Sequence, residues 1–492
     1  MSAPAAASSP AAEARDYDSS HKWLAFSAIG ISFVTMVMSQ SMVFVALSAI
    51  ADDFGITLRA VSWVVIAQAL TISALMMPMG RLADMVGWKR IHLVGLALFA
   101  IGCIFIAVSP VFWILIAARV VMAAGNAMGQ SVGTAMVVSV FPPEERGMAI
   151  GSQTSAVAIG GVSGPIVGGL VLQILPWEAL FLILVVPIVI AFIAGYIILD
   201  EHKMRMDRGK QRLPFDWGGA IISSIAISLL VITINNPLRF GWTSSAQAGS
   251  LLAVVVLGAV FVYWELRYAN PMLELRLFRD RVFSLAVVTR MFGFMGTTAT
   301  LFMMPIYLIS FRGIAEGAAG GVLFLTSLGM GISAQAAGRL SDRFGPRRFT
   351  ILGLTMVLIT AVPMSFLGRN TPIPLVMALL LVAGLGSGFF NVPNNSMILG
   401  ASPASALGVV AALTNLVRNV GNVFGQAIAS GVVVAVMVAK GFDIPLGDVG
   451  DNPEAGGAFL DGWRIAFTLV SAYAAIGLAC TFGTKDPKPV AA

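Results

Sequence analysis

The chain has 492 residues, of which 58% are hydrophobic and 11% are charged, whereas soluble domains carry about 45–50% apolar and about 25% charged residues. This composition excludes a soluble enzyme and predicts a polytopic membrane protein, because about 20 apolar residues make one helical span. The formal net charge of +6 is typical of basic cytoplasmic loops and does not predict a nucleic-acid partner.

The first segment, residues 1–22, mixes small residues, Pro and charges of both signs, so we expect a disordered cytoplasmic tail. Fourteen apolar stretches of spanning length follow it and predict an all-α membrane protein. These predicted spans cover residues 23–50, 59–80, 91–109, 111–140, 148–173, 177–199, 215–234, 247–268, 282–311, 316–338, 349–367, 372–400, 408–439 and 463–483.

Basic residues predict the orientation of these spans, because Lys and Arg are retained on the cytoplasmic side of a membrane. With both termini in the cytoplasm, the cytoplasmic segments hold 21 of the 30 Lys and Arg residues, and the segments on the other side hold 6. We therefore expect a multi-pass protein of the cell membrane, inner or plasma, with both termini cytoplasmic.

The loop after the second predicted span reads GRLADMVGWKR at 80–90. Gly80 and Gly87 allow close helix approach and a tight turn, and Asp84 can accept charge-assisted hydrogen bonds across the cytoplasmic face. We expect the loop to lock one conformation as a gate, although a short basic loop can also serve only to fix topology. Its basic residues are Arg81, Lys89 and Arg90.

A second copy of this segment, GRLSDRFGPRR, follows the tenth predicted span at an offset of 258 residues. It extends the expected gate to Gly338, Arg339, Asp342, Gly345, Arg347 and Arg348. The repeat predicts two parallel six-helix halves related by a pseudo-two-fold axis, which is a transporter architecture. The expected parts are the halves 23–199 and 282–483, a region of basic linkers with an inserted helix pair at 200–281, and a cytoplasmic tail at 484–492.

Three arginines lie deep within predicted spans, namely Arg119, Arg290 and Arg418. A charged residue in the membrane costs roughly 2.5–3.5 kcal/mol on insertion scales, so each is a candidate for the substrate or proton pathway. An arginine satisfied by backbone carbonyls for packing alone is the other interpretation. We further hypothesise that Arg290 binds an anionic group of the substrate.

The fifth predicted span contains GGVSGPIVGG, which places Gly160, Gly164 and Gly168 four residues apart on one helix face, with Pro165 as a bend. This spacing predicts close packing against another helix, and we assign these four residues to the conformational machinery.

Neutral polar residues provide further candidates for the pathway. In the thirteenth predicted span Asn415, Asn419 and Asn422 fall on one helical face that also includes Gln426. Asn391 lies in the twelfth span, and Gln68, Gln130 and Gln153 offer similar groups in the first half. Hydrogen bonding between helices without any ligand is an equal alternative for each of them.

Chemistry of soluble enzymes is not visible in the sequence. There is no GxxxxGK[ST] phosphate loop, so ATP is not expected to drive transport directly. The three histidines do not form a ligand cluster, and no Asp or Glu lies in the middle of a predicted span. We therefore expect no cofactor, no metal and no enzymatic activity.

The segment GRLADMVGWKR resembles the signature loop of the major facilitator superfamily. The fourteen-span layout with an inserted pair is similar to its drug:proton antiporter branch, and the resemblance extends over most of residues 23–483. Further segments that carry it are FDWGGAI at 215–221, GWTSS at 241–245, NPMLELRLFRDRVF at 270–283 and GRLSDRFGPRR at 338–348.

The resemblance implies a major facilitator fold of 6 + 2 + 6 helices that exports small amphiphilic compounds, as a multidrug or metabolite efflux pump, by proton antiport and alternating access. It also implies a monomer whose partners are substrate, lipid and protons. Arg119 occupies the family's fourth-span arginine position, but Ser39 stands where the family carries a first-span Asp. One alternative is a narrow exporter or facilitator of a neutral or anionic metabolite, or of a lipid, without proton coupling. A membrane receptor that does not transport is another.

Overall fold

The computed structural model of the chain describes residues 19–200, 214–236, 244–403, 406–444, 446–450, 452 and 454–485. Most of the expected N-terminal tail lies outside the described residues. The same holds for the basic segment 201–213, for part of the GWTSS segment and for the end of the C-terminal tail.

Within the described residues, fourteen helices are long and apolar enough to cross a membrane, which confirms the predicted all-α fold. A helix satisfies the backbone N–H and C=O groups of a span internally, and this is why apolar stretches adopt it in lipid. The spanning helices are α1 (Ser19–Asp53), α3 (Trp63–Val86), α4 (Trp88–Ala107), α5 (Phe112–Val140), α6 (Arg146–Leu172), α7 (Glu178–Ile198), α9 (Trp217–Asn235), α10 (Ser245–Arg267), α11 (Arg281–Pro305), α12 (Glu316–Phe344), α13 (Pro346–Met364), α14 (Ile373–Gly400), α15 (Leu407–Ala439) and α16 (Ala455–Phe482).

Short elements complete the chain. Helix α2 (Leu58–Val61) precedes α3, and the 3-10 helix η2 (Leu275–Arg279) precedes α11. A π-helical segment, η3 (Ile306–Phe311), extends α11. The last span begins earlier than predicted, since α16 starts at Ala455, where glycines and an acidic residue lower the hydropathy without ending the helix.

The two copies of the repeated segment are helical, and the expectation that Asp84 and Asp342 lie in loops is wrong. Gly87 alone separates α3 from α4, with a φ of 125°, and Gly345 alone separates α12 from α13, with a φ of 87°. Glycine adopts such angles without a steric cost, so a single residue can make the turn. Both carboxylates are therefore held by the last turns of helices.

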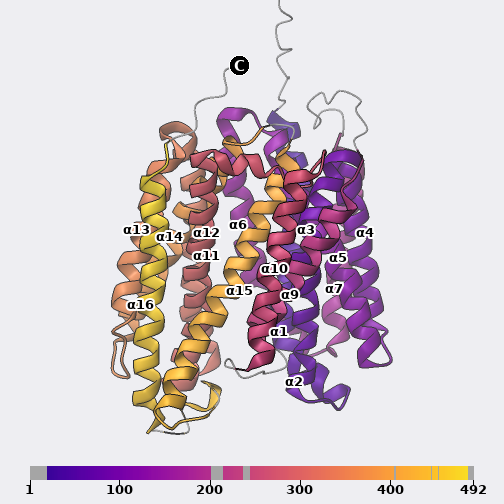
Figure 1. Cartoon of the computed structure of the whole chain (residues 1–492). Coiled ribbons are helices and arrows are strands. Elements are labelled where there is room, and N and C mark those ends of the chain that lie inside the picture. Colours follow the sequence, from indigo (N-terminus) through magenta and orange to yellow (C-terminus); the bar gives the residue numbers. More distant parts are fainter. Residues whose placement is uncertain are drawn as a thin grey trace, which may run out of the picture.

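Two groups of spanning helices stand side by side, and we call α1–α7 the N-half and α11–α16 the C-half (Figure 1). The halves meet where α6 packs on α12 and where α3 and α5 pack on α15. Because the number of spans is even, α1 begins and α16 ends at the same end of the bundle, which we call the termini end.

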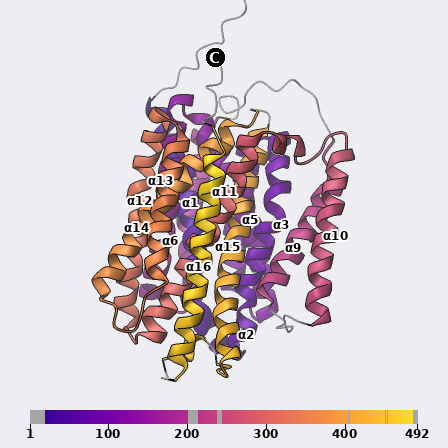
Figure 2. The same cartoon turned by 60° about the vertical axis from the view of Figure 1, so that its left-hand side comes forward.

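Helices α9 and α10 form a pair at the edge of the bundle (Figure 2). Helix α9 packs against α3 of the N-half and α15 of the C-half. Most of α10 is exposed, and only 6% of its most apolar window is buried in the protein. In a membrane that surface faces lipid, and α9 connects the pair to the interface between the halves.

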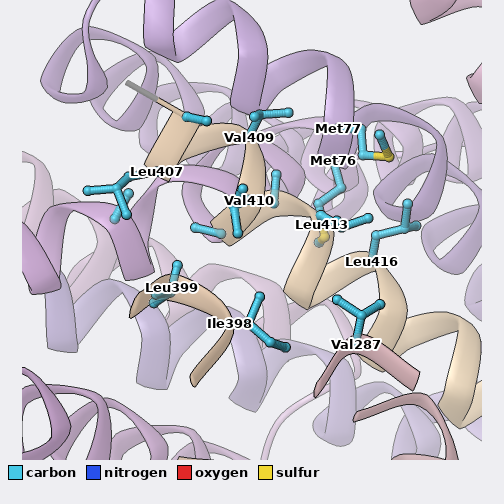
Figure 3. Packing of buried hydrophobic residues seen from close by; sticks show 14 of the residues in the cluster. Met76, Met77, Val287, Ile398, Leu399, Leu407, Val409, Val410, Leu413 and Leu416 are labelled. Atoms are coloured by element: carbon cyan, nitrogen blue, oxygen red, sulfur yellow. The ribbon is translucent and has the colours of Figure 1, made fainter. Parts of the chain in front are cut away.

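An apolar core joins the halves toward the termini end. Its centre is the first turns of α15, where Leu413 lies beside Met76 of α3 and Leu407 lies on the other side, towards Leu399 of α14 (Figure 3). Residues of α5, α6, α11, α12 and α14 belong to the same cluster. Close packing of this kind leaves little space for water, so the cluster seals this end of the interface.

Candidate functional site

The carboxylate of Asp84 connects α3 to the beginning of α15 across the interface. Its Oδ2 atom accepts a hydrogen bond from the backbone N–H of Val409 at 3.1 Å, and its Oδ1 atom accepts one from the Trp88 indole at 2.9 Å. Asp84 is 5% exposed. A side chain on Gly408 would overlap this carboxylate. The first N–H groups of a helix lack partners within it and attract anions, so Asp84 fixes α15 to the N-half.

The carboxylate of Asp342 makes the matching connection from α12 to the beginning of α6. Its two oxygens accept from the backbone N–H groups of Gly147 at 2.7 Å and Met148 at 2.9 Å. Asp342 is exposed, unlike Asp84. The repeat therefore builds two related contacts between the halves, which we call clamps. The carboxylate of the Asp84 clamp is buried, and that of the Asp342 clamp is exposed to solvent.

The basic residues of the repeated segments bind within their own halves. Lys89 donates to the carbonyls of Tyr196 and Leu199 at the end of α7, at 2.8 and 2.6 Å. Arg347 donates to the carbonyl of Phe482 at the end of α16, at 2.9 Å. These contacts join neighbouring helix ends. Of the other predicted gate residues, Arg90, Arg339 and Arg348 are exposed, and Arg81 is half-buried.

The contact between α6 and α12 continues from the Asp342 clamp toward the middle of the bundle. Gln335 donates to the Ser152 hydroxyl at 3.0 Å, and Ser155 donates to the Gly331 carbonyl at 2.9 Å. A side chain on Gly338 would overlap the opposite backbone. The two helices are thus in van der Waals contact along several turns.

The glycines predicted for the fifth span pack α6 onto α1 inside the N-half. A Cβ atom on Gly160 would meet the carbonyl of Val34, and one on Gly164 would overlap the Ser41 hydroxyl. Gly168 lies against Met42 in the same way, and Pro165 lies within the helix. The predicted close packing is present, and its partner is a helix of the same half.

Arg119 is fully buried inside the N-half. Its guanidinium donates to the Gln68 side-chain oxygen, to the Val64 carbonyl at 3.4 Å and to the Met122 sulfur at 3.2 Å. It also lies 5.5 Å from the centre of the Phe181 ring. All of these partners are neutral, so dipoles and an aromatic face stabilise the charge.

Arg290 lies on α11 and Arg418 on α15, and the charge of Arg418 acts on Arg290. Arg290 donates to the Thr414 carbonyl at 2.8 Å and to the Asn391 side-chain oxygen at 3.1 Å. Arg418 donates across the interface to the Gln130 side-chain oxygen at 2.9 Å. The described salt bridges include neither arginine. Both positive charges are therefore bound by neutral oxygens.

The polar face of α15 becomes more exposed with distance from the termini end. Asn415 is 5% exposed and donates to the Gln130 carbonyl at 3.0 Å. Asn419 and Asn422 are half-buried, and Gln426 is exposed. An amide face of this kind is expected to meet a water-filled cavity rather than lipid. The interface is therefore closed at the termini end, and the amides of α15 become more exposed away from that end.

Other polar contacts involve residues that the sequence did not single out. Thr298 donates to the Asn422 side-chain oxygen at 2.5 Å. The predicted pathway residue Gln153 is buried inside the N-half, where it donates to the Thr134 hydroxyl at 2.8 Å. Threonine is common in membrane helices, so its occurrence alone gave no signal for these positions.

The model of the Major Facilitator Superfamily matches residues 29–426, with a further match over residues 286–492. The chain belongs to the Major Facilitator Superfamily. This major facilitator protein is 29% identical over 409 residues to the riboflavin transporter RibZ of Clostridioides difficile, a match that covers 83% of this chain and 88% of RibZ. It is 28% identical over 414 residues to the multidrug resistance protein Stp of Mycobacterium tuberculosis, over 84% of this chain and 76% of Stp.

Among solved structures, this major facilitator protein is similar to the human organic anion transporter MFSD10. The TM-score is 0.64 at 15% sequence identity, over 94% of this chain and 99% of that chain, and the similarity shows the shared fold. With the family established, the chain is a multi-pass membrane transporter of small molecules and not an enzyme.

Proposed function

We propose that this transporter exports small amphiphilic compounds by alternating access, and that Arg290 and Arg418 select compounds with an anionic group. The observation that carries this proposal is that both guanidinium groups are bound by neutral oxygens and that neither takes part in a described salt bridge. We place the protein in the cell membrane as a monomer with both termini in the cytoplasm. The termini end is then the closed cytoplasmic end.

Electrostatics favours an anion at this position. Like charges repel more strongly in a medium of low dielectric than in water, so two arginines whose charges interact gain when an anion lies between or beside them. Arg418 is half-buried and lies on the polar face of α15, so a ligand in the interface can reach it. A carboxylate or phosphate can also form bidentate hydrogen bonds with a guanidinium group.

Aromatic side chains beside the arginines suit the apolar part of such a compound. The Arg290 guanidinium lies 5.1 Å from the centre of the Phe294 ring, which in turn lies 5.8 Å from the Phe390 ring. Phe294 is half-buried, so part of its surface remains available. Binding sites of this type combine apolar walls with a few placed polar groups. An amphiphile fits that combination better than a sugar does.

Two features support export rather than import. The glycine-rich α6 resembles the motif of exporters in this superfamily, and the relative Stp is named as a multidrug resistance protein. The relative RibZ is named as a riboflavin transporter, which favours a narrow substrate range as the alternative.

We propose that the proton gradient drives the export. Exchange of one inward proton for one outward monovalent anion moves two charges in the favourable direction, and each charge is worth about 2.3 kcal/mol per 100 mV. The second candidate is a facilitator that releases anions down the membrane potential alone. The carboxylates of the described spans all lie toward helix ends. A carboxylate in the middle of a span is the simplest proton carrier, so this distribution favours the second candidate.

Transport of a fluorescent carboxylate and of its methyl ester by proteoliposomes tests the anion selectivity. We expect Arg290→Gln and Arg418→Gln each to lower carboxylate transport at least tenfold and to change ester transport little. Arg464→Gln is the matched control, because this exposed arginine forms a salt bridge with Asp461 of its own helix. If both variants lost carboxylate transport and ester transport equally, that result would contradict the proposed selectivity for an anionic group.

A further inference from the structure

The inserted helix pair contains two buried carboxylates outside the interface described above. Asp216 directly precedes α9, and Glu265 lies in the last turn of α10. Asp216 is 2% exposed and Glu265 is 3% exposed. Burial of two like charges is unfavourable unless partners compensate for it. The hydrogen bonds of these two carboxylates therefore show which of their oxygens lack a partner.

One oxygen of each carboxylate is bound, and the other is not. Asp216 Oδ1 accepts from the Gly219 N–H at 2.8 Å and from the Trp264 indole at 2.9 Å. Glu265 Oε2 accepts from the Leu273 N–H at 3.2 Å. Among the described residues, Asp216 Oδ2 and Glu265 Oε1 have no hydrogen-bond partner.

The two unpartnered oxygens face the same small space. A Cβ atom on Gly219 would lie 2.5 Å from Asp216 Oδ2 and 2.7 Å from Glu265 Oε1. The missing side chain of Gly219 is therefore what allows both oxygens to approach this point. Two carboxylates that converge in a buried site repel each other when both carry a charge.

The charges around the pair leave one negative charge uncompensated. On α3, Arg81 is near enough to act on Glu265. On α15, Arg418 binds Gln130 instead. The other charged residues of these segments are exposed to solvent. They are Arg267 in α10, Glu274 directly before η2, and Arg276 and Arg279 in η2. One half-buried cation thus acts on a site that contains two buried carboxylates.

We propose that Asp216 and Glu265 form a proton-binding site that holds one shared proton between Asp216 Oδ2 and Glu265 Oε1. Release of this proton leaves two negative charges within the electrostatic range of Arg81 and strengthens the attraction between this site and α3. Arg81 lies one turn from Asp84, so proton occupancy acts on the helix that carries the buried clamp. This link to export rests on the proposed function, whereas proton occupancy can be measured without transport.

Infrared spectroscopy of the full chain in lipid nanodiscs tests the site, because a protonated carboxylic acid has a carbonyl band that a carboxylate lacks. We expect such a band at neutral pH in the wild-type protein, and its loss in both Glu265→Gln and Asp216→Asn. In either variant the remaining carboxylate has no second carboxylate with which to share a proton. Glu274→Gln, which changes a nearby exposed carboxylate, is the control and should keep the band.

Three results would overturn the proposal. A wild-type spectrum without the band would show that neither group holds a proton. A band lost in Glu265→Gln but kept in Asp216→Asn would show a singly protonated Glu265 with no sharing. Removal of the band by sodium chloride, but not by choline chloride, would assign the site to a metal cation instead.

A transport measurement keeps this proposal separate from the proposed function. In proteoliposomes with an imposed pH gradient, Glu265→Gln should still move the fluorescent carboxylate but no longer dissipate the gradient. Unchanged gradient dissipation in this variant would remove the coupling role of the site. A wild-type protein that exports nothing would contradict the proposed function, and the infrared result would still decide the proton site.

Discussion

At the scale of single residues, the two aspartates of the repeated segments differ in environment although they match in sequence. Asp84 is buried and Asp342 is exposed, while both accept hydrogen bonds from the beginning of a helix in the other half. Hydrogen bonds to charged groups contribute about 1.5–3 kcal/mol, and solvent screens the exposed charge more strongly. The Asp84 clamp therefore contributes more to closure of the termini end.

This difference predicts unequal effects of removing each charge. We expect Asp84→Asn to weaken closure by about 1–2 kcal/mol, which corresponds to a roughly 5–30-fold larger open population, and Asp342→Asn to do less. The measurement is the labelling rate of a cysteine introduced as Ala158→Cys, which is buried beside the interface, with a reagent added on the termini side. Equal labelling rates in the two aspartate variants would contradict this assignment.

At the scale of elements, the glycines of α6 are required for contact with α1. A side chain on Gly164 would overlap Ser41 and the α1 backbone, whereas a Cβ atom on Gly169 would meet nothing within 4 Å. Insertion of bulk into a packed interface typically costs about 1–3 kcal/mol. These two glycines, five residues apart on the same helix, therefore have different structural roles.

We predict that Gly164→Leu lowers the unfolding temperature of the purified protein and its yield in the membrane. Gly169→Leu is the matched control, and we expect no loss of stability from it because leucine has the better helix propensity. Thermal unfolding in detergent, followed by tryptophan fluorescence, compares the two variants. A Gly164→Leu protein as stable as the control would show that α1 and α6 can separate without cost.

Most of the helices could be predicted from the sequence, because about 20 consecutive apolar residues leave a chain few other structures in lipid. The prediction for the fourth span, 111–140, agrees closely with α5. The partners of Asp84 could not be predicted, because they are backbone groups of α15, and no pattern within one segment shows which helix end lies opposite. The amides of α15 were predicted as one face, but their gradient of exposure depends on how the halves are packed.

At the scale of the whole molecule, a contact between the two halves closes the termini end, and the proposed alternating access requires this contact to separate. The Ala158 Cβ atom of α6 lies 3.9 Å from the position of a Cβ atom on Gly331 of α12. Disulfides join Cβ atoms about 3.8 Å apart. This pair can therefore test whether the halves move as alternating access requires.

We predict that Ala158→Cys combined with Gly331→Cys forms a disulfide under oxidation and stops transport, and that a reductant restores it. The background should carry Ser in place of Cys103 and Cys480. Each single-cysteine variant serves as the control and should transport under both conditions. Full transport by the cross-linked protein would mean that α6 and α12 stay together throughout the cycle.

Exchange of protons for compounds with an anionic group is the function that we propose for this transporter. Its most direct test uses proteoliposomes with an imposed pH gradient, in which the lumenal pH and the flux of a fluorescent carboxylate are recorded together. We predict that the carboxylate dissipates the gradient and that its methyl ester does not. Equilibration of the carboxylate without any proton movement would contradict the claim and would identify the protein as a facilitator.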